Sequence, residues 1–446
     1  MSLEYDLIII GAGTVGCVAA VAFGKQGRKV LIIERDMSEP NRIVGEYLQP
    51  GGVVALEKLG LSECLENIDS IPCYGYGVFY GGETVSFLYP NVNGKPARGR
   101  AFHHGRFIMN LRNAASKISN VTICEAMAND IISCPLTERA LGVICTPKGE
   151  SDVRHFRKDF ILRDVQIKSN FVGIIMKDTV LPFPNHGHVI LANSPVCMYQ
   201  IGTHETRALI DIPGKLPSNG SGELKKYIEN NVLPFIPKPI QLNFRPSFYE
   251  ALQTERLRSM PNSFLPPSTN VNGGLIILGD AMNMRHALTG GGMTVGFCDV
   301  VILSDLLSPA QTPDFNDTGL ILAQLQVFHW KRKFYCSTVI NVLAQVLYSV
   351  FAAADDEYLR IMREACFNYF KFGGICVSHP CGMLAGLVQN PLLLIFHFFA
   401  VAIYGVYRIF REDTMLHMPQ NILKSFIVIY TACVTVLPVL LTELKF

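Results

Sequence analysis

The stretch "LIIIGAGTVGCVAAVAFGKQGRKVLIIERD" (Leu7–Asp36) decides the fold. An apolar run at residues 7–10 leads into three glycines, Gly11, Gly13 and Gly16, and a small-residue segment follows them. A second apolar run then ends at Glu34. This order predicts a strand, a tight turn, a helix and a second strand within about thirty residues.

The spacing of the glycines predicts a dinucleotide site. Gly11 allows the sharp turn out of the strand, Gly13 lets the backbone approach a pyrophosphate, and Gly16 lets the helix pack closely on the sheet. The pyrophosphate would lie at the helix N-terminus, where free N–H groups favour negative charge. Glu34 stands where a carboxylate would accept from ribose hydroxyls. The spacing alone does not choose between NAD and FAD.

A second glycine motif lies in "GGLIILGDAMNMRHALTGGGMTVGFCDVVILSDLL" (273–307). Leu275–Leu278 is predicted to be a buried strand that ends at Gly279 and Asp280, and a glycine-led helix follows. Asp280 can hydrogen-bond a ribityl or ribose hydroxyl, while N–H groups near Gly291 and Gly292 can face a pyrophosphate or the flavin edge. Alone, the motif is equally typical of an ordinary strand, loop and helix. Together with the first motif it favours FAD, which is long enough to need both sites.

Composition bounds the class of protein. The 446 residues suggest about three domains, although two large ones are as plausible. A net charge of +2 gives no indication of nucleic-acid binding, and 49% hydrophobic against 17% charged residues is apolar for a soluble enzyme. The thirteen cysteines form no CxxC pair, which predicts reduced thiols in a cytosolic compartment and no metal site.

The pattern along the chain predicts an α/β fold: a Rossmann-like FAD-binding domain with an inserted antiparallel-sheet substrate domain and a C-terminal helical, membrane-associated region. Strand-like alternation runs through residues 170–212, with Pro, Asn and Gly between the strands. We therefore expect the first part of the FAD-binding domain at 1–150 and the mainly antiparallel substrate domain at 151–270. The FAD-binding domain would return at 271–325, and 326–446 would be helical with a membrane anchor.

Two apolar runs near the C-terminus predict the anchor. They are "LLLIFHFFAVAIYGVYRIF" (392–410) and "FIVIYTACVTVLPVLL" (426–441). Each is at or below the roughly 20 residues that span hydrocarbon, and His397 and Pro438 weaken a spanning interpretation further. We expect two helices embedded in one leaflet. The alternatives are a membrane-spanning helical hairpin and a soluble helical core.

Several longer strings carry a family resemblance. The strings "NRIVGEYLQPGG" (41–52), "AFHHGRFIMNLR" (101–112), "LRSMPNSFLPPS" (257–268) and "GDAMNMRHALTGGGMTVGFCDV" (279–300) are similar to those of squalene monooxygenase (squalene epoxidase), a flavoprotein monooxygenase family. The resemblance covers most of the chain. It implies FAD-dependent epoxidation of squalene to 2,3-oxidosqualene in sterol biosynthesis, with O₂ and electrons from NADPH. It also implies a cytochrome P450 reductase-type donor and an endoplasmic reticulum membrane location, with the catalytic part facing the cytosol.

The same resemblance assigns roles to residues. Tyr76 and Gln49 would lie at the junction of flavin and substrate pocket, although a tyrosine in a strand more often simply packs on its sheet. Phe171 and Tyr199 could line an apolar substrate tunnel or belong to the core. The residues implied to line the FAD are Thr14, Val15, Glu34, Arg35, Arg42, Tyr47, Arg112, Ala128, Asp280 and Met293.

One departure from the family pattern is large. The family carries an apolar strand that ends in Asp-Gly shortly before a "FRK" segment, and this chain has "FRK" at 156–158 but no Asp-Gly dipeptide anywhere. Asp152, followed by Val153, is the nearest remnant. We expect a missing segment of roughly a dozen residues, enough for one strand. The alternative functions are an impaired or incomplete family member that acts as a membrane scaffold, or another lipid-modifying flavoprotein.

Overall fold

The computed structural model describes residues 4–92, 94–149, 165–254, 257–352, 356–412 and 417–444. The predicted first unit is confirmed, with β1 (Leu7–Ile10), α1 (Thr14–Lys25) and β2 (Val30–Glu34). β2 pairs in parallel with β1 and with β10 (Val121–Ser133), and β11 (Ala140–Pro147) pairs antiparallel with β10. The departure at Asp152, Val153 and 156–158 lies outside the described residues.

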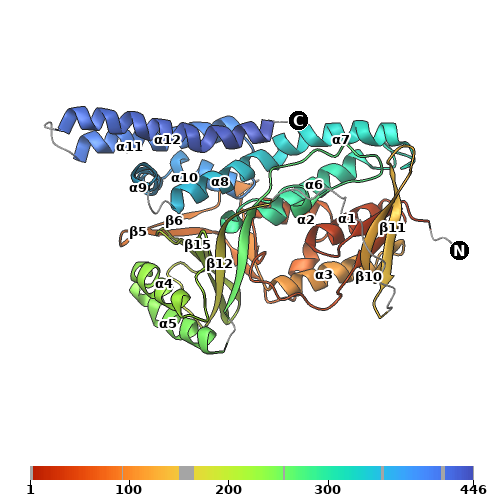
Figure 1. Cartoon of the computed structure of the whole chain (residues 1–446), viewed down its shortest axis with the longest axis horizontal. Helices are drawn as coiled ribbons and strands as arrows, with labels where there is room; N and C mark the ends of the chain where they lie inside the picture. Colours follow the sequence, from red (N-terminus) through yellow and green to blue (C-terminus); the bar gives the residue numbers. More distant parts are fainter. Residues whose placement is uncertain are drawn as a thin grey trace.

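Three further helices of the half that contains both glycine motifs pack around this sheet. They are α2 (Pro50–Lys58), α3 (His104–Ser116) and α6 (Gly292–Leu306), and α1 and α6 share one apolar core. In Figure 1 this half lies at the right, near the N-terminus. The helix predicted after the second glycine motif is therefore confirmed.

A seven-stranded sheet forms the second half, in the order β16-β12-β15-β14-β13-β5-β6. All its neighbours are antiparallel except β13 and β5, so the predicted antiparallel sheet is confirmed for 170–212. Two of its strands, β5 and β6, come from the first 150 residues. The bounds are β5 Gly75–Tyr80, β6 Glu83–Leu88, β12 Gln166–Lys177, β13 His186–Ile190, β14 Val196–Gly202, β15 Glu205–Pro213 and β16 Arg258–Phe264.

Two helices cover one face of this sheet, α4 (Glu223–Asn231) and α5 (Lys238–Gln253). They lie at the lower left of Figure 1, on the side away from the C-terminal helices. The short elements are β3 Tyr47–Leu48, β4 Ile71–Cys73, β7 Asn91–Val92, β8 Lys95–Pro96, β9 Gly99–Ala101, η1 Ser62–Leu65, η2 Leu233–Phe235, η3 Gly279–Ala281 and η4 Ala287–Thr289.

The predicted strand at Leu275–Leu278 is wrong. The segment is half-buried and is extended without a sheet partner among the described residues. The side chain of Asn270 instead bonds both backbone groups of Ile277, at 2.7 Å to its N and 3.3 Å to its O. Beside it, β1 pairs only with β2 within the described part of the chain, and Ile10 is 54% exposed.

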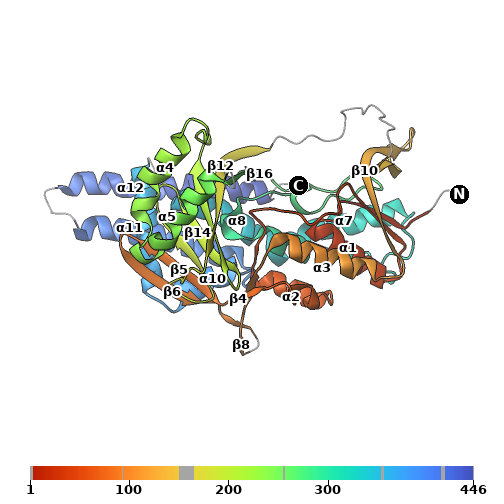
Figure 2. The same cartoon turned by 90° about the horizontal axis from the view of Figure 1, so that it is seen from below.

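The C-terminal part is helical, as predicted. α11 (Pro391–Glu412) and α12 (Met418–Leu444) run side by side along the top of Figure 1, and Figure 2 shows the same pairing from below. They have 22 and 27 residues, so the expectation that each is at or below the spanning length is wrong. The helices beneath them are α7 Thr318–Arg332, η5 Lys333–Ser337 (a π-helical turn), α8 Thr338–Phe351, α9 Glu357–Lys371 and α10 Ile375–Leu384.

Candidate active site

A single large cavity of about 1500 Å³ lies between the two glycine motifs and the seven-stranded sheet. Its walls include most of the residues that the sequence singled out. These are Gly11, Gly13, Thr14, Val15, Gly16, Glu34, Arg35, Arg42, Tyr47, Gln49, Tyr76, Arg112, Gly279, Asp280, Gly292 and Met293.

The first glycine turn has the geometry that its spacing predicts. Gly11 has φ +101°, which L side chains rarely adopt. A Cβ on Gly16 would lie 2.0 Å from the carbonyl oxygen of Gly11, so only glycine lets the helix approach the turn. A Cβ on Gly13 or on Gly292 would meet nothing within 4 Å. The backbone is therefore open at the two places where a pyrophosphate and a flavin edge would approach.

The two motifs meet at the side chain of Val15. A Cβ on Gly279 would lie 3.3 Å from Val15 Cγ2, and one on Gly296 would lie 2.6 Å from the same atom. The starts of α1 and α6 are therefore neighbours although they are far apart in the sequence. One elongated cofactor can reach both, and the open glycines, the acidic Glu34 and the room between the motifs fit FAD.

Arg112 and Glu34 hold the glycine turn together. The Glu34 carboxylate accepts from the backbone N–H of Ala12 at 2.8 Å. Arg112, only 5% exposed, donates to the carbonyl oxygens of Ala12 at 3.0 Å, Asp36 at 3.1 Å and Ser38 at 3.0 Å. Arg112 therefore shapes the loop that surrounds the adenosine end of the cavity.

Two of the predicted residues, Ala128 and Gly291, are not among the residues that line the cavity. Ala128 lies in β10 opposite Cys145 of β11. Gly291 is buried at the start of α6, where an added Cβ would lie 2.3 Å from Ile340 Cγ2. The structure thus gives Gly291 a packing role.

The other end of the cavity holds a cluster of hydroxyl and amide groups. Gln49 Nε2 donates to Tyr76 Oη at 2.5 Å and to the carbonyl oxygen of Thr289 at 2.7 Å. Tyr89 Oη lies 2.9 Å from both Gln49 Oε1 and Tyr47 Oη. Burial raises the pKa of all three phenols above its ordinary value, so they are protonated at neutral pH. Tyr89 carries no sequence signal, because its contacts are all distant in the chain.

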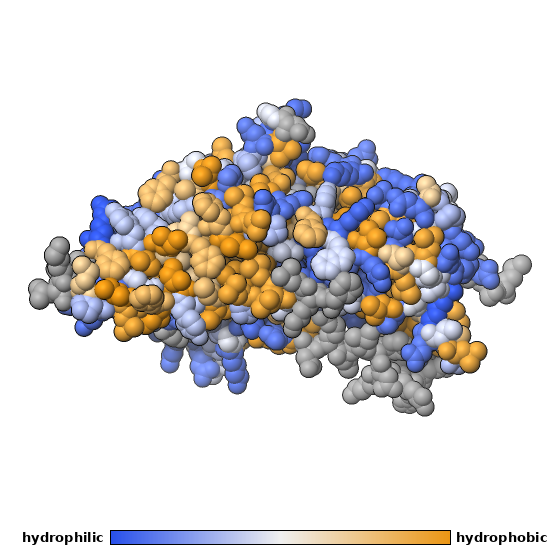
Figure 3. Space-filling view, turned by 90° about the horizontal axis from the view of Figure 1, so that it is seen from above, coloured by the Kyte–Doolittle hydropathy of each residue, from blue (hydrophilic) through white to orange (hydrophobic). Residues whose placement is uncertain are grey.

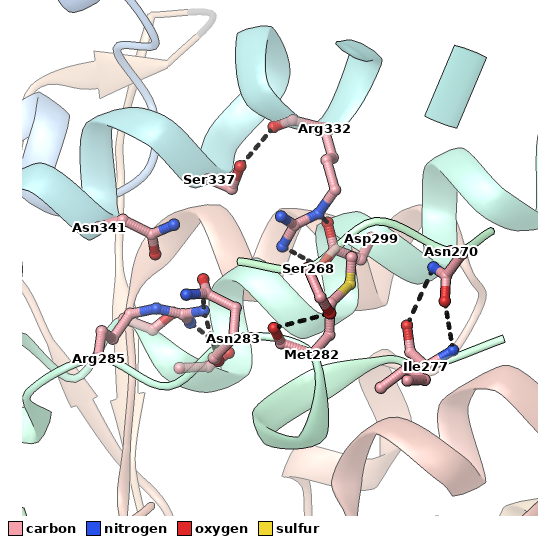
Figure 4. A network of polar contacts seen from close by, with 12 residues as sticks. Ser268, Asn270, Ile277, Met282, Asn283, Arg285, Asp299, Arg332, Ser337 and Asn341 are labelled. Carbon is pink, nitrogen blue, oxygen red and sulfur yellow. Dashed lines mark hydrogen bonds and ion pairs between the residues drawn. The ribbon is translucent and has the colours of Figure 1, made fainter. Parts of the chain in front are cut away.

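Arg285 is a second residue that the sequence reasoning missed. Its Nη2 donates to Asn283 Oδ1 at 2.6 Å, and its Nη1 lies 3.4 Å from the carbonyl oxygens of Gly291 and Gly292 (Figure 4). It lines the cavity, and burial lowers its pKa. Its place five residues before the glycine run that begins at Gly290 was the available signal.

Further polar contacts fix this loop on its helices. Arg332 forms a buried bidentate pair with Asp299 of α6, at 2.9 and 2.8 Å (Figure 4). The hydroxyl of Ser268 donates to the carbonyl oxygen of Met282 at 3.4 Å. The loop between Gly279 and Met293 is therefore held from several sides.

Apolar side chains line part of the sheet side of the cavity. Phe171 is fully buried and Tyr199 is 7% exposed, and both belong to one core cluster and line the cavity. The cavity also follows the free edge of β1, from Tyr5 to Ile10, and it is bounded there by Leu275–Leu278 and by the α6 residue Leu303. It thus has three regions: a cofactor groove, an apolar chamber and a slot beside β1.

Comparison with solved structures defines the fold. PqsL of Pseudomonas aeruginosa, described as a probable FAD-dependent monooxygenase, matches with a TM-score of 0.60 and 18% identity over 78% of this chain and 95% of its own. The flavin-dependent brominase Bmp2 matches with a TM-score of 0.68 and 15% identity over 90% of this chain and 99% of its own. This chain therefore has the fold of these flavin-dependent enzymes.

Comparison of sequences defines the family. A squalene epoxidase profile matches residues 150–423. Squalene epoxidase erg1 of Aspergillus fumigatus is 48% identical over 98% of this chain and 93% of its own, and squalene monooxygenase of Mus musculus is 41% identical over 99% and 78%. The chain belongs to the squalene epoxidase family. This favours an enzyme over the alternative of a membrane scaffold.

Proposed function

We propose that this chain epoxidises squalene to 2,3-oxidosqualene with FAD, O₂ and electrons that come from NADPH, in sterol synthesis. Family membership supports this reaction. The observation that carries it is a single cavity that joins both glycine motifs to an apolar chamber with Tyr76 and Gln49 on its wall.

FAD supplies the redox chemistry that transfers electrons to O₂ for oxygen insertion. The open backbone at Gly13 would hold its pyrophosphate, and Glu34 its adenosine ribose. Asp280 would bond a ribityl hydroxyl. The N–H groups at Gly292 and Met293 begin α6, and the positive helix end would favour negative charge on the flavin.

The remaining work of the protein is positioning and exclusion of water. Squalene has no polar group, so its affinity must come from buried apolar surface, about 25 cal/mol per Å². Phe171, Leu209 and Leu288 give the chamber apolar walls. Dry surroundings also strengthen the hydrogen bonds of Tyr76 and Gln49 with any group bound beside them.

The electrons would come from NADPH through a cytochrome P450 reductase-type donor. This proposal rests on the family resemblance. It agrees with the sequence, which has no further glycine fingerprint of the strand–turn–helix kind for a second dinucleotide.

We propose further that α11 and α12 lie in one leaflet of the endoplasmic reticulum membrane, with the catalytic part in the cytosol. One face of each helix packs on the body of the protein, at Val401 and Ala402 and at Val428 and Ala432. The opposite faces are apolar and exposed, and Figure 3 shows hydrophobic side chains gathered over this region. Large exposed side chains there include Leu392, Phe396, Ile403, Tyr407, Ile422, Leu423, Phe426 and Tyr430.

The charge pairs between α9 and the two apolar helices favour one leaflet over spanning. The partner helix α9 is amphipathic and places charged groups against α11 and α12, as in the Arg408–Glu364 pair at 2.6 Å and the Lys424–Glu357 pair at 2.9 Å. Such pairs suit an interface better than hydrocarbon.

The slot beside β1 supports the inference of a missing strand. The alignment with the Aspergillus fumigatus relative spans 457 positions, more than the 446 residues of this chain, so gaps fall in this chain. The edge of a parallel sheet is normally paired or covered by another part of the chain. We expect transcript sequencing across residues 145–156 to reveal additional codons for an apolar strand. Transcripts that encode only the present sequence would contradict this proposal and leave the cofactor proposal standing.

The proposed reaction is tested with the full chain purified in detergent. Flavin absorbance bands and formation of 2,3-oxidosqualene that requires both NADPH and O₂, with a P450 reductase added, would support it. A colourless protein would refute the cofactor assignment. Bound flavin that oxygenates only a phenol would refute the substrate.

A further inference from the structure

Behind the candidate active site, four buried side chains form one hydrogen-bonded row: Tyr47, Tyr89, Gln49 and Tyr76. Their exposed fractions are 7%, 4%, 0% and 8%. Tyr47, Gln49 and Tyr76 line the cavity, whereas Tyr89 is not among its lining residues. Tyr89 follows β6, and its backbone N–H is fixed by the carbonyl oxygen of Tyr74 at 2.7 Å. Tyr89 therefore joins the other three side chains from outside the cavity, and its backbone position is fixed by this hydrogen bond.

The directions of these hydrogen bonds follow from one atom. The carbonyl oxygen of Thr289 can only accept, so the Gln49 atom 2.7 Å away must be the amide nitrogen. The second amide proton then points to Tyr76 Oη at 2.5 Å. The amide oxygen consequently faces Tyr89, which donates to it at 2.9 Å.

The single proton of each phenol completes the assignment. Tyr89 uses its proton on Gln49, so in the Tyr47–Tyr89 bond of 2.9 Å Tyr47 is the donor. Tyr76 Oη accepts from Gln49, and the hydroxyl of Tyr89 is its second hydrogen-bonding neighbour within the row. If Tyr89 donated to Tyr47 instead, the buried amide oxygen of Gln49 would lose this donor, which costs about 1–3 kcal/mol.

We propose that Tyr89 is a positioning residue for the epoxidation. Its hydroxyl donates to the Gln49 amide oxygen and so supports, together with the carbonyl oxygen of Thr289, the orientation in which the amide nitrogen donates to Tyr76 Oη. Because Tyr76 lines the cavity, its hydroxyl can donate to a group bound there while its oxygen accepts from Gln49. This proposal rests on the proposed function, because the group that receives the hydrogen bond is the bound cofactor or its oxygen.

The test is Tyr89→Phe in the full chain, compared with Tyr80→Phe as a matched control. Tyr80 lies in β5 and packs on Phe367, outside the cavity wall. For Tyr89→Phe we expect flavin content and the rate of flavin reduction within twofold of wild type. The 2,3-oxidosqualene formed per NADPH consumed should fall about tenfold, as expected for loss of one buried hydrogen bond. Tyr80→Phe should match wild type in all three.

A double-mutant cycle keeps the proposal testable if the single variant is poorly stable. In a Gln49→Met background, where no amide remains to be oriented, Tyr89→Phe should change product per NADPH less than twofold for each bound flavin. If the double variant loses product per NADPH by the product of the two single-variant losses, Tyr89 acts independently of Gln49 and the proposal is overturned. A Tyr89→Phe variant that forms as much 2,3-oxidosqualene per NADPH as wild type would also overturn the proposal. A wild-type chain that binds flavin but makes no epoxide would instead refute the proposed function.

Discussion

Gly13, before α1, and Gly16, in its first turn, should differ in what they lose when each is replaced by alanine. Gly13 has φ −82°, which alanine adopts freely, and an added Cβ would meet nothing within 4 Å. The methyl group at position 13 would therefore leave the folded apoprotein unstrained. It would, however, occupy the space through which a pyrophosphate approaches the backbone.

At position 16 the added Cβ would lie 2.0 Å from the carbonyl oxygen of Gly11, and either the turn or the helix must move. Overpacking of this kind costs about 1–3 kcal/mol, less up to about 1 kcal/mol for the better helix propensity of alanine. Gly16→Ala should thus destabilise the apoprotein. Gly13→Ala should instead weaken FAD binding by about 1.5–3 kcal/mol, roughly 10- to 150-fold, because charged hydrogen bonds to the pyrophosphate are lost.

The assay measures both quantities on the same proteins. Denaturant unfolding of the apoprotein gives stability, and titration of FAD followed by quenching of flavin fluorescence gives the dissociation constant. We expect Gly13→Ala to change the second without the first. If Gly13→Ala binds FAD as tightly as wild type, the pyrophosphate does not lie at this turn and the cofactor assignment is refuted.

Three further outcomes are expected. Asp299→Asn leaves the buried Arg332 guanidinium without its charged partner, since both side chains are at most 2% exposed, and it should lower the free energy of unfolding by about 3–5 kcal/mol. Combining Asp299→Asn with Arg332→Met should recover most of the lost stability. A double variant that stays as unstable as the single one would contradict this account. Phe426→Glu, at a side chain 73% exposed on α12, should reduce liposome partitioning about 10- to 100-fold with flavin content unchanged, as a co-sedimentation assay would show. Burial lowers the pKa of His188 from 6.5 to about 4, so its contribution is complete above pH 6.5 and is lost as pH falls toward 4. At pH 5 the free energy of unfolding should be about 2 kcal/mol lower than above pH 6.5. The variant His188→Gln keeps an acceptor for the Phe183 N–H, and its stability in urea unfolding should depend less on pH.

The sequence predicted the parts of the site that depend on local spacing. Gly11, Gly13 and Gly16 act within one turn, so their spacing alone implies the open backbone and the close helix. Tyr89 and Arg285 could not be found in this way, because their partners lie in distant segments that only the fold brings together. The proximity of Tyr76 to Gln49 was available from the family resemblance but from no local pattern.

The lengths of the C-terminal helices show another limit of local patterns. The apolar run ends near residue 410, yet α11 continues to Glu412. Arg408 there contacts Glu412, one turn later, at 2.5 Å, and Glu364 of α9 at 2.6 Å. Paired charges therefore extend the helix past the end of its apolar run, and a prediction based on hydropathy stops too early.

The error at Leu275–Leu278 and the slot beside β1 have one physical cause. The run has a strand's composition, but an extended segment becomes a strand only when a neighbour accepts and donates its backbone hydrogen bonds. Here the side chain of Asn270 takes both backbone groups of Ile277, while the free edge of β1 faces the cavity. A strand placed between β1 and Leu275–Leu278 would pair both edges and cover Ile10. The missing segment proposed above, as a strand at this position, would account for the failed strand, the open edge and the exposed isoleucine together.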